Sequence, residues 1–287
     1  MIQIGLRLHD SAETSFRERL INVHDQGFSC VHVALSKIPG LPADREMLTP
    51  GYAAWLRHAF EAAGLDIAVL GCYKNLANPN RAVLVDTQKT YEYNIRFAAQ
   101  LGCGMVGTET GAPNETYTYD KEACHSEEAL RTFITNLRPV VKYAESCGVI
   151  IAIEPVYKHI VWNPRRARIV LDAIDSPNLQ IIFDPVNLLH PDNLDHRDEV
   201  IAEAIELLWP DIAMIHLKDY IYKDGAMTSV GCGLGEMNYD SIIRFALEKK
   251  PFIEATLENT KPENAEQCRK YIESIEENQA KLLEEKI

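Results

Sequence analysis

The sequence predicts an α/β fold in which eight βα units close into a single (β/α)8 barrel. Two observations support this prediction. Short apolar runs alternate with helix-forming segments along the chain, and no linker, low-complexity tract or change of composition interrupts them. Four of the later runs also end on a metal-type ligand, and successive ligands are 30, 32 and 42 residues apart. One βα unit, which needs about 30 or more residues, accounts for each interval.

Eight apolar runs are predicted to form the strands. Runs such as VIIAI and QIIF are continuously apolar, as is typical of parallel strands covered on both faces. An open, doubly wound sheet would show the same alternation and remains the alternative. In chain order, the predicted strands are Ile2–Leu8, Cys30–Leu35, Ile67–Leu70, Met105–Thr108, Val149–Ile153, Gln180–Phe183, Ile212–Leu217 and Phe252–Leu257.

Proline and glycine mark the ends of several predicted helices. Thr49 and Pro50 are expected to begin a helix that Gly64 ends, and the pair Asn163–Pro164 to begin the helix after the fifth strand. Three further glycines are expected to end helices: Gly27, Gly102 and Gly148.

Length and composition are consistent with one domain over residues 1–287, because such barrels typically have about 250 residues. With 46% hydrophobic and 25% charged residues, the chain can bury a sizeable core. No apolar stretch approaches the roughly 18 residues of a membrane helix, and no basic-then-apolar leader opens the chain. Seven scattered cysteines without a CxxC pair predict free thiols. We therefore expect a soluble cytoplasmic protein without a membrane partner.

Charge and glycine patterns exclude two classes of partner. The formal net charge of -13 would repel a phosphate backbone, so we expect no nucleic-acid partner. The GCGLG segment at Gly231–Gly235 does not follow a first strand and lacks the acidic residue of a dinucleotide site, so no nucleotide cofactor is predicted. We interpret this segment as a mobile loop over the active site, with a simple connector as the alternative.

The runs IIAIE, IIFD, AMIH and FIEATLE end on Glu154, Asp184, His216 and Glu258. The carboxyl ends of barrel strands meet on one face, so these four side chains are predicted to surround one ion. Three carboxylates and an imidazole favour a divalent ion such as Mn²⁺, Mg²⁺ or Co²⁺, with Zn²⁺ also compatible.

Strand alternation refines this set. Glu254, Thr256 and Glu258 share a face, and Glu258 lies at the exit end, so Glu254 is interpreted as a deeper structural carboxylate. Lys218 has the parity of His216, and two readings stay open for it: an inward contact with substrate, or an ion pair with Asp219.

Other polar residues after the strands are candidates for contact with substrate, and an ordinary surface position is the alternative for each. The run Arg165, Arg166 and Arg168 could attract phosphate but is interpreted as a solvated helix face, so no phosphorylated substrate is predicted. The candidates are His9 after the first strand, Tyr73 and Asn75 after the third, Glu109 after the fourth, and His159 and Trp162 after the fifth.

The segments AIEP, SPNLQIIFDPVNLL, HLKD, GCGLGEMNYDSI and LEN resemble the sugar-phosphate isomerase/epimerase family of xylose-isomerase-like TIM barrels. The resemblance spans most of the chain and lies in the order and spacing of these motifs. It implies a carbohydrate substrate and one metal ion, with Mn²⁺ expected first, held by Glu154, Asp184, His216 and Glu258. It also implies that Glu154 and Glu258 act as base and acid, while the ion stabilises an enediolate.

Departures from the family leave the substrate open. Asn187 stands where several ketose epimerases have a histidine, and its amide can bind a substrate hydroxyl but cannot titrate. Tyr222 stands where some place a substrate-binding arginine. The related apurinic-site endonucleases use additional histidines, whereas no histidine follows His216.

The predicted function is a metal-dependent isomerase or epimerase of a small sugar or keto-sugar. A sugar or inosose dehydratase is the alternative, because it would use the same metal and glutamates. A non-catalytic sugar-binding protein and an endonuclease are weaker alternatives. The sequence leaves open whether the chain forms a homo-oligomer.

Overall fold

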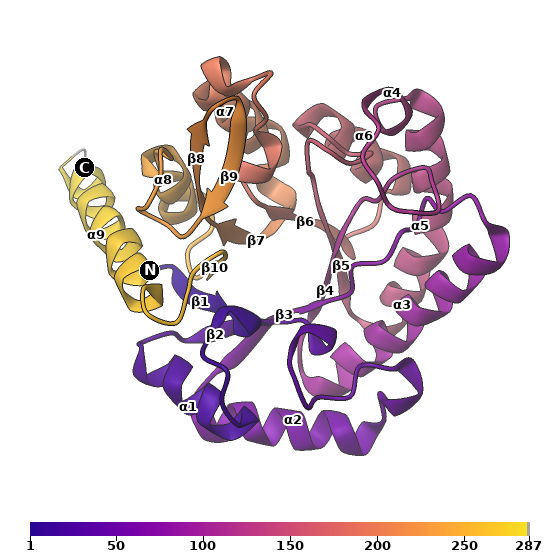
Figure 1. The fold of residues 1–287 in the computed structure, drawn as a ribbon, viewed down its shortest axis with the longest axis horizontal. Helices are drawn as coiled ribbons and strands as arrows, with labels where there is room; N and C mark the ends of the chain where they lie inside the picture. The colour runs from indigo at the N-terminus through magenta and orange to yellow at the C-terminus, as the bar shows by residue number, and fades with distance from the viewer. Residues whose placement is uncertain (286–287) are drawn as a thin grey trace.

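The computed structural model describes residues 1–285 and shows eight parallel strands closed into a barrel with helices around it (Figure 1). The order around the barrel is β1-β10-β7-β6-β5-β4-β3-β2. Because β1 pairs with both β2 and β10, the barrel sheet has no free edge. The (β/α)8 prediction is confirmed, and the open-sheet alternative is wrong. Residues 286 and 287 of the predicted domain lie outside the described residues.

Every predicted barrel strand is present, with ends within two residues of those expected. Neighbouring barrel strands all pair in parallel, with register shifts in the β2–β3 and β6–β7 pairs, so their carboxyl ends lie at one end of the barrel. The strands are β1 (Gln3–Arg7), β2 (Cys30–Val33), β3 (Asp66–Gly71), β4 (Met105–Glu109), β5 (Ile150–Glu154), β6 (Leu179–Phe183), β7 (Ile212–Leu217) and β10 (Glu254–Leu257).

Helices connect the strands and cover the outside of the barrel (Figure 1). They are α1 (Phe16–Asp25), α2 (Pro50–Ala63), α3 (Arg81–Leu101), α4 (Lys121–Cys124), α5 (Glu127–Cys147), α6 (Pro164–Ile174), α7 (Arg197–Leu208), α8 (Asp240–Lys249) and α9 (Ala265–Glu284). None of the helices within residues 1–285 is long and apolar enough to cross a membrane.

The predicted helix ends are explained by their caps. The Thr49 side chain accepts the Tyr52 N–H in the first turn of α2, and the Asn163 side chain accepts the Arg166 N–H in the first turn of α6. Gly64 ends α2 in the left-handed conformation, with φ of 69°, which a side chain would disfavour. Gly102 and Gly148 end α3 and α5 in the same way. Gly27 lies two residues beyond the end of α1.

The barrel interior is packed with apolar side chains, so polar chemistry is confined to the strand ends. A cluster of Cys30, Ala68, Val69, Met105, Ala152, Ile182 and Met214 fills it. Gly107 leaves room for two of these residues, because a Cβ there would lie 2.7 Å from Ile182 Cδ1 and 2.8 Å from Val69 Cγ2. All seven cysteines are free, as predicted.

A two-stranded antiparallel hairpin, β8 (Asp219–Lys223) and β9 (Ala226–Val230), follows β7 and was not predicted. Its outer strand residues are largely exposed, so the sequence there lacks the apolar run that marks the barrel strands. The buried Asp219 carboxylate accepts the N–H groups of Gly233, Gly235 and Met237 at 3.1, 3.0 and 2.8 Å. The GCGLG segment is therefore tied to the hairpin base, which does not favour the mobile loop that we expected.

Candidate active site

The four side chains predicted to bind metal converge at the carboxyl ends of β5, β6, β7 and β10, and all are buried. His216 Nδ1 lies 3.4 Å from Glu154 Oε1 and 3.3 Å from Glu258 Oε1. Glu154, Asp184 and His216 offer ligand atoms within 4.8 Å of one another. The structure thus brings together residues that are far apart in sequence, as strand-end placement implies.

Lys218 points into this cluster. Its Nζ lies 2.7 Å from Asp184 Oδ2 and 3.2 Å from Glu258 Oε2. The side chain is buried, so the ammonium depends on these carboxylates to offset its lost hydration. The inward orientation expected from strand parity is correct, and the alternative ion pair with Asp219 is wrong, because the Asp219 carboxylate binds backbone N–H groups instead.

Burial and charge shift the acid–base properties of the cluster. Burial raises the pKa of Asp184 to about 6, although the ammonium of Lys218 opposes the rise. Burial also opposes the ionised form of Glu258, yet Lys218 and His216 hold its pKa well below the usual range. For His216, burial lowers the pKa, but the carboxylates of Glu258 and Glu154 outweigh burial and raise it to about 9. The buried carboxylates of this cluster therefore need positive charge close by to offset their lost hydration.

The donor atoms fit a divalent metal ion. Both ring nitrogens of His216 are buried without a hydrogen-bond partner, whereas buried polar atoms normally have one. Carboxylate oxygens and an imidazole nitrogen together form a ligand set suited to hard and borderline divalent ions. A second group of possible ligands, His32, His216 and Glu258, shares the same imidazole.

A cavity of about 300 Å³ opens over the cluster. Residues that the sequence analysis named as candidates for substrate contact line it: His9, Tyr73, Glu109, Asn187 and Lys218. Asn187 Nδ2 donates to Glu154 Oε1 at 2.5 Å, and its backbone N–H donates to Asp184 Oδ1 at 3.0 Å. Asn187 therefore orients two carboxylates of the cluster as well as facing the cavity.

His159, another of these candidates, is not among the residues that line the cavity. Its Nδ1 lies 3.9 Å from Glu109 Oε2, which also accepts a hydrogen bond from the Tyr117 hydroxyl at 3.0 Å. Burial, together with the charge of Glu154, raises the pKa of Glu109 to about 7. His159 Nδ1 is buried and makes no hydrogen bond within the described residues, so its contact with substrate stays a prediction.

Several other rim candidates have structural contacts. Asn75 Nδ2 donates to the carbonyls of Ala112 and Asn114 at 2.9 Å each, and the Trp162 ring stacks on His125 at 4.5 Å. The helix-start arginines are also engaged: Arg165 with Glu203, Arg166 with the carbonyls of His125 and Ser126, and Arg168 with Asp172 and Asp211. The expected solvated helix face is wrong for Arg166, which is buried because its guanidinium binds those two carbonyls, whereas Arg165 is exposed.

Arg7 and His32 line the cavity but were not predicted. Arg7 Nη1 lies 3.4 Å from Glu258 Oε2. The His32 ring stacks on His216, with centroids 5.2 Å apart, and its Nε2 lies 3.1 Å from the hydroxyl of Tyr73. The sequence did carry a signal for both residues. Arg7 is a polar residue at the end of the strand QIGLR, and His32 is a polar residue within the apolar strand CVHV.

Comparison with known proteins identifies the class of barrel. The model of the family described as xylose isomerase-like TIM barrel matches residues 20–278. Among proteins of curated function, none matches the sequence significantly.

Three solved structures illustrate the likeness. An L-ribulose 3-epimerase has 16% identity and a TM-score of 0.75, and the match covers 99% of this chain and 97% of that chain. A xylose isomerase-like TIM barrel protein from Mycobacterium smegmatis in complex with magnesium has 16% identity and a TM-score of 0.71, with 97% of each chain covered. A xylose isomerase-like TIM barrel/4-hydroxyphenylpyruvate dioxygenase fusion protein has 15% identity and a TM-score of 0.75, with 99% of this chain but only 44% of that chain covered. At these identities the likeness concerns the fold.

Proposed function

Because this chain belongs to the xylose isomerase-like TIM barrel family, we propose that it is a metal-dependent isomerase or epimerase of a keto-sugar. One observation carries the proposal. Glu154 and Glu258 approach His216 from different strands, at 3.4 and 3.3 Å, and both line the same cavity. Two carboxylates that face one small cavity are what a reaction needs when one group removes a proton and another returns it.

Glu154, Asp184, His216 and Glu258 would hold one divalent ion, for which we expect Mn²⁺ first and Mg²⁺, Co²⁺ or Zn²⁺ as alternatives. When bound, the ion supplies positive charge that stabilises the oxygen of an enediolate. The unpartnered nitrogens of His216 support the assignment, since a metal–nitrogen bond would satisfy one of them. The magnesium-bound barrel of the same fold is consistent with an ion at such a site.

Side chains around the cavity would transfer the proton and hold the substrate. Ionised Glu258 is a base from which burial excludes competing water, and Glu154 faces the same cavity as the second proton carrier. Asn187 holds Glu154 in place through its 2.5 Å hydrogen bond. Lys218 lines the cavity and offers N–H groups to a substrate oxygen. Proton transfer beside a carbonyl is redox-neutral, so it requires no nucleotide cofactor.

Deuterium exchange tests the proposal. The Mn²⁺-loaded protein is incubated with a panel of ketoses, keto-acids and inososes in deuterium oxide, and the products and recovered substrates are examined by mass spectrometry and NMR. We expect deuterium at the carbon beside the carbonyl. Glu154→Gln and Glu258→Gln should each lower turnover by at least about 10², because an amide cannot accept the proton.

Controls separate catalysis from metal binding. Metal content is measured by elemental analysis for each variant, since both glutamates are proposed ligands. Glu254→Gln is the matched control. Glu254 begins β10, the strand that leads to Glu258, but it does not line the cavity, so near-normal turnover is expected.

Three outcomes would contradict the proposal. Loss of water with a deoxy or unsaturated product would identify the dehydratase alternative. Conversion with neither deuterium uptake nor internal hydrogen transfer would exclude an enediolate. Binding of sugars without any exchange, in fully metal-loaded protein, would favour the non-catalytic alternative.

A further inference from the structure

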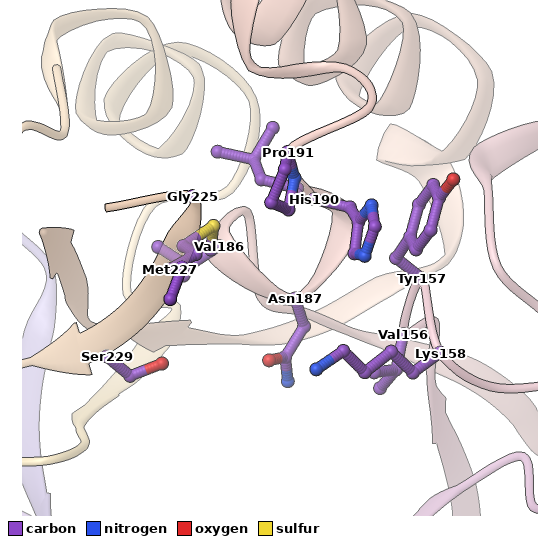
Figure 2. A pocket seen from close by; sticks show the side chains of 12 residues that line it. Val156, Tyr157, Lys158, Val186, Asn187, His190, Pro191, Gly225, Met227 and Ser229 are labelled. Carbon is purple, nitrogen blue, oxygen red and sulfur yellow. The ribbon is translucent and has the colours of Figure 1, made fainter. Parts of the chain in front are cut away.

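A second cavity, of about 330 Å³, adjoins the active site (Figure 2). The segments after β5 and β6 and the β8–β9 hairpin form its walls. Asn187 lines this cavity as well as the cavity over Glu154 and Glu258. The same side chain donates a hydrogen bond to Glu154, so only Asn187 separates the second cavity from this proposed proton carrier.

We propose that the second cavity is a subsite for a neutral, ring-sized, hydroxylated group, so that the substrate is a glycosylated keto-sugar rather than a free monosaccharide. This inference rests on the proposed function, because the reacting keto-sugar would occupy the cavity over the carboxylates. It adds the substrate class, which neither the carboxylate cluster nor the fold specifies.

The size of the two cavities supports an extended ligand. Pockets for small molecules commonly range from about 300 to 1,000 Å³. The cavity over the carboxylates, at about 300 Å³, lies at the lower end of that range. The neighbouring 330 Å³ offers a similar space to a second group joined to the first.

The wall chemistry suits a sugar ring, whose faces are apolar and whose edges carry hydroxyls. Val156, Val186 and Met227 supply apolar surface. The rings of Tyr157 and His190 stack with centroids 4.3 Å apart and an interplanar angle of 5°. Figure 2 shows the His190 ring between Tyr157 and the middle of the pocket, where it offers a flat face.

Polar groups are placed for hydroxyls rather than for an anion. Asn187, Lys158 and Ser229 line the pocket and offer both donors and acceptors, and Figure 2 shows Asn187 between the other two side chains. Lys158 is exposed, and burial lowers the pKa of His190, which favours the neutral ring. One exposed ammonium is not the cluster of fixed donors that phosphate sites use. Within the part of the chain that is described, no carboxylate lines this cavity.

Hydrogen bonds within the protein hold the Tyr157 side of the pocket wall in place. The Tyr157 N–H donates to the Asn187 carbonyl at 2.7 Å, which joins the segments after β5 and β6. The Tyr157 hydroxyl donates to Asp192 Oδ2 at 2.8 Å, and Lys121 Nζ pairs with the same oxygen at 2.6 Å. A fixed ring pair avoids the entropy cost of ordering the wall on binding.

Calorimetry of the Mn²⁺-loaded protein tests the subsite. The probes are fructose, three disaccharides that carry a hexose on O3, O4 or O6 of fructose (turanose, lactulose and isomaltulose), and fructose 6-phosphate. We expect at least one disaccharide to bind about 10-fold more tightly than fructose, because only the disaccharide fills both cavities.

Two kinds of variant locate that preference. Met227→Trp should abolish the gain for the disaccharide and leave fructose affinity within about 2-fold, because the indole would fill the subsite alone. Thr228→Trp is the matched control, since Thr228 is the next residue on β9 and is exposed outside the cavity. If Met227→Trp fails to fold, Lys158→Ala and Ser229→Ala should each weaken the disaccharide several-fold without weakening fructose.

The outcomes separate the two proposals. Equal affinity for fructose and all three disaccharides, or a preference that survives Met227→Trp, overturns the subsite. Tighter binding of fructose 6-phosphate than of every disaccharide overturns it in favour of an anionic tail, and failure of all disaccharides to bind overturns it as well. The proposed function is judged separately by deuterium exchange, whose result does not depend on this cavity.

Discussion

Replacing Lys218 by methionine is expected to destabilise the metal-free protein by about 3 to 5 kcal/mol, because removing one partner of a buried ion pair leaves uncompensated charge. The ammonium lies 2.7 Å from Asp184 Oδ2 and 3.2 Å from Glu258 Oε2, and the three side chains are at most 7% exposed. Methionine keeps the unbranched apolar stem, so the change tests charge more than packing.

Thermal unfolding measures this loss. At about 2 to 4 °C per kcal/mol, the variant should melt at least about 6 °C below the parent protein when both are treated with a chelator. A pH of about 8 is suitable, because it lies above the pKa of about 6 for Asp184 and keeps that carboxylate charged. Adding Mn²⁺ should raise the melting temperature of the variant more than that of the parent, since the ion would offset the carboxylates that lost the ammonium.

Lys142→Met is the matched control. Lys142 lies exposed on α5 and makes no ion pair within the described part of the chain, so a shift within about 1 °C is expected. A Lys218→Met variant that melts within about 2 °C of the parent would refute the charge argument. An equal gain from Mn²⁺ in both proteins would refute the view that the ion and Lys218 serve the same carboxylates.

Three further predictions concern Glu109, Asp219 and Gly107. The pKa of Glu109 is raised from 4.5 to about 7 by burial and by the charge of Glu154, so its stabilising effect is present below about pH 4.5 and is lost as pH rises through 7. Glu109→Gln should flatten that fall in urea unfolding across this range, and an unchanged slope would contradict the shift. Asp219→Ala should cost at least about 3 kcal/mol, because it removes the acceptor of the buried N–H groups of Tyr220 and Met237 and of the partly buried ones of Gly233 and Gly235. Hydrogen exchange should then accelerate at Gly233, Gly235 and Met237, and unaltered exchange would show that other contacts hold them. Gly107→Ala should cost about 1 to 3 kcal/mol by overpacking the barrel interior, whereas Gly104→Ala, with no atom within 4 Å of the added Cβ, should be nearly neutral in the same denaturation assay.

The sequence by itself determined the alternation of strands and helices and placed four candidate metal ligands at the strand ends. Both depend on local patterns, because a strand buried on both faces must be apolar along its length and a crossover helix requires a minimum number of residues. The positions of Glu154, Asp184, His216 and Glu258 follow directly, since each ends or follows such a run. Helix ends at Gly64 and Asn163 were predictable for the same reason, because caps act within a few residues.

Only the tertiary structure decided what these residues contact. The stacking of His32 on His216, and the placement of Lys218 between Asp184 and Glu258, depend on distances across the mouth of a closed barrel. A local pattern reports burial and period but not which side chains meet across that space, so Arg7 and His32 were missed. The second cavity likewise exists only because the β8–β9 hairpin stands against the segments after β5 and β6, a contact between elements that no single segment specifies.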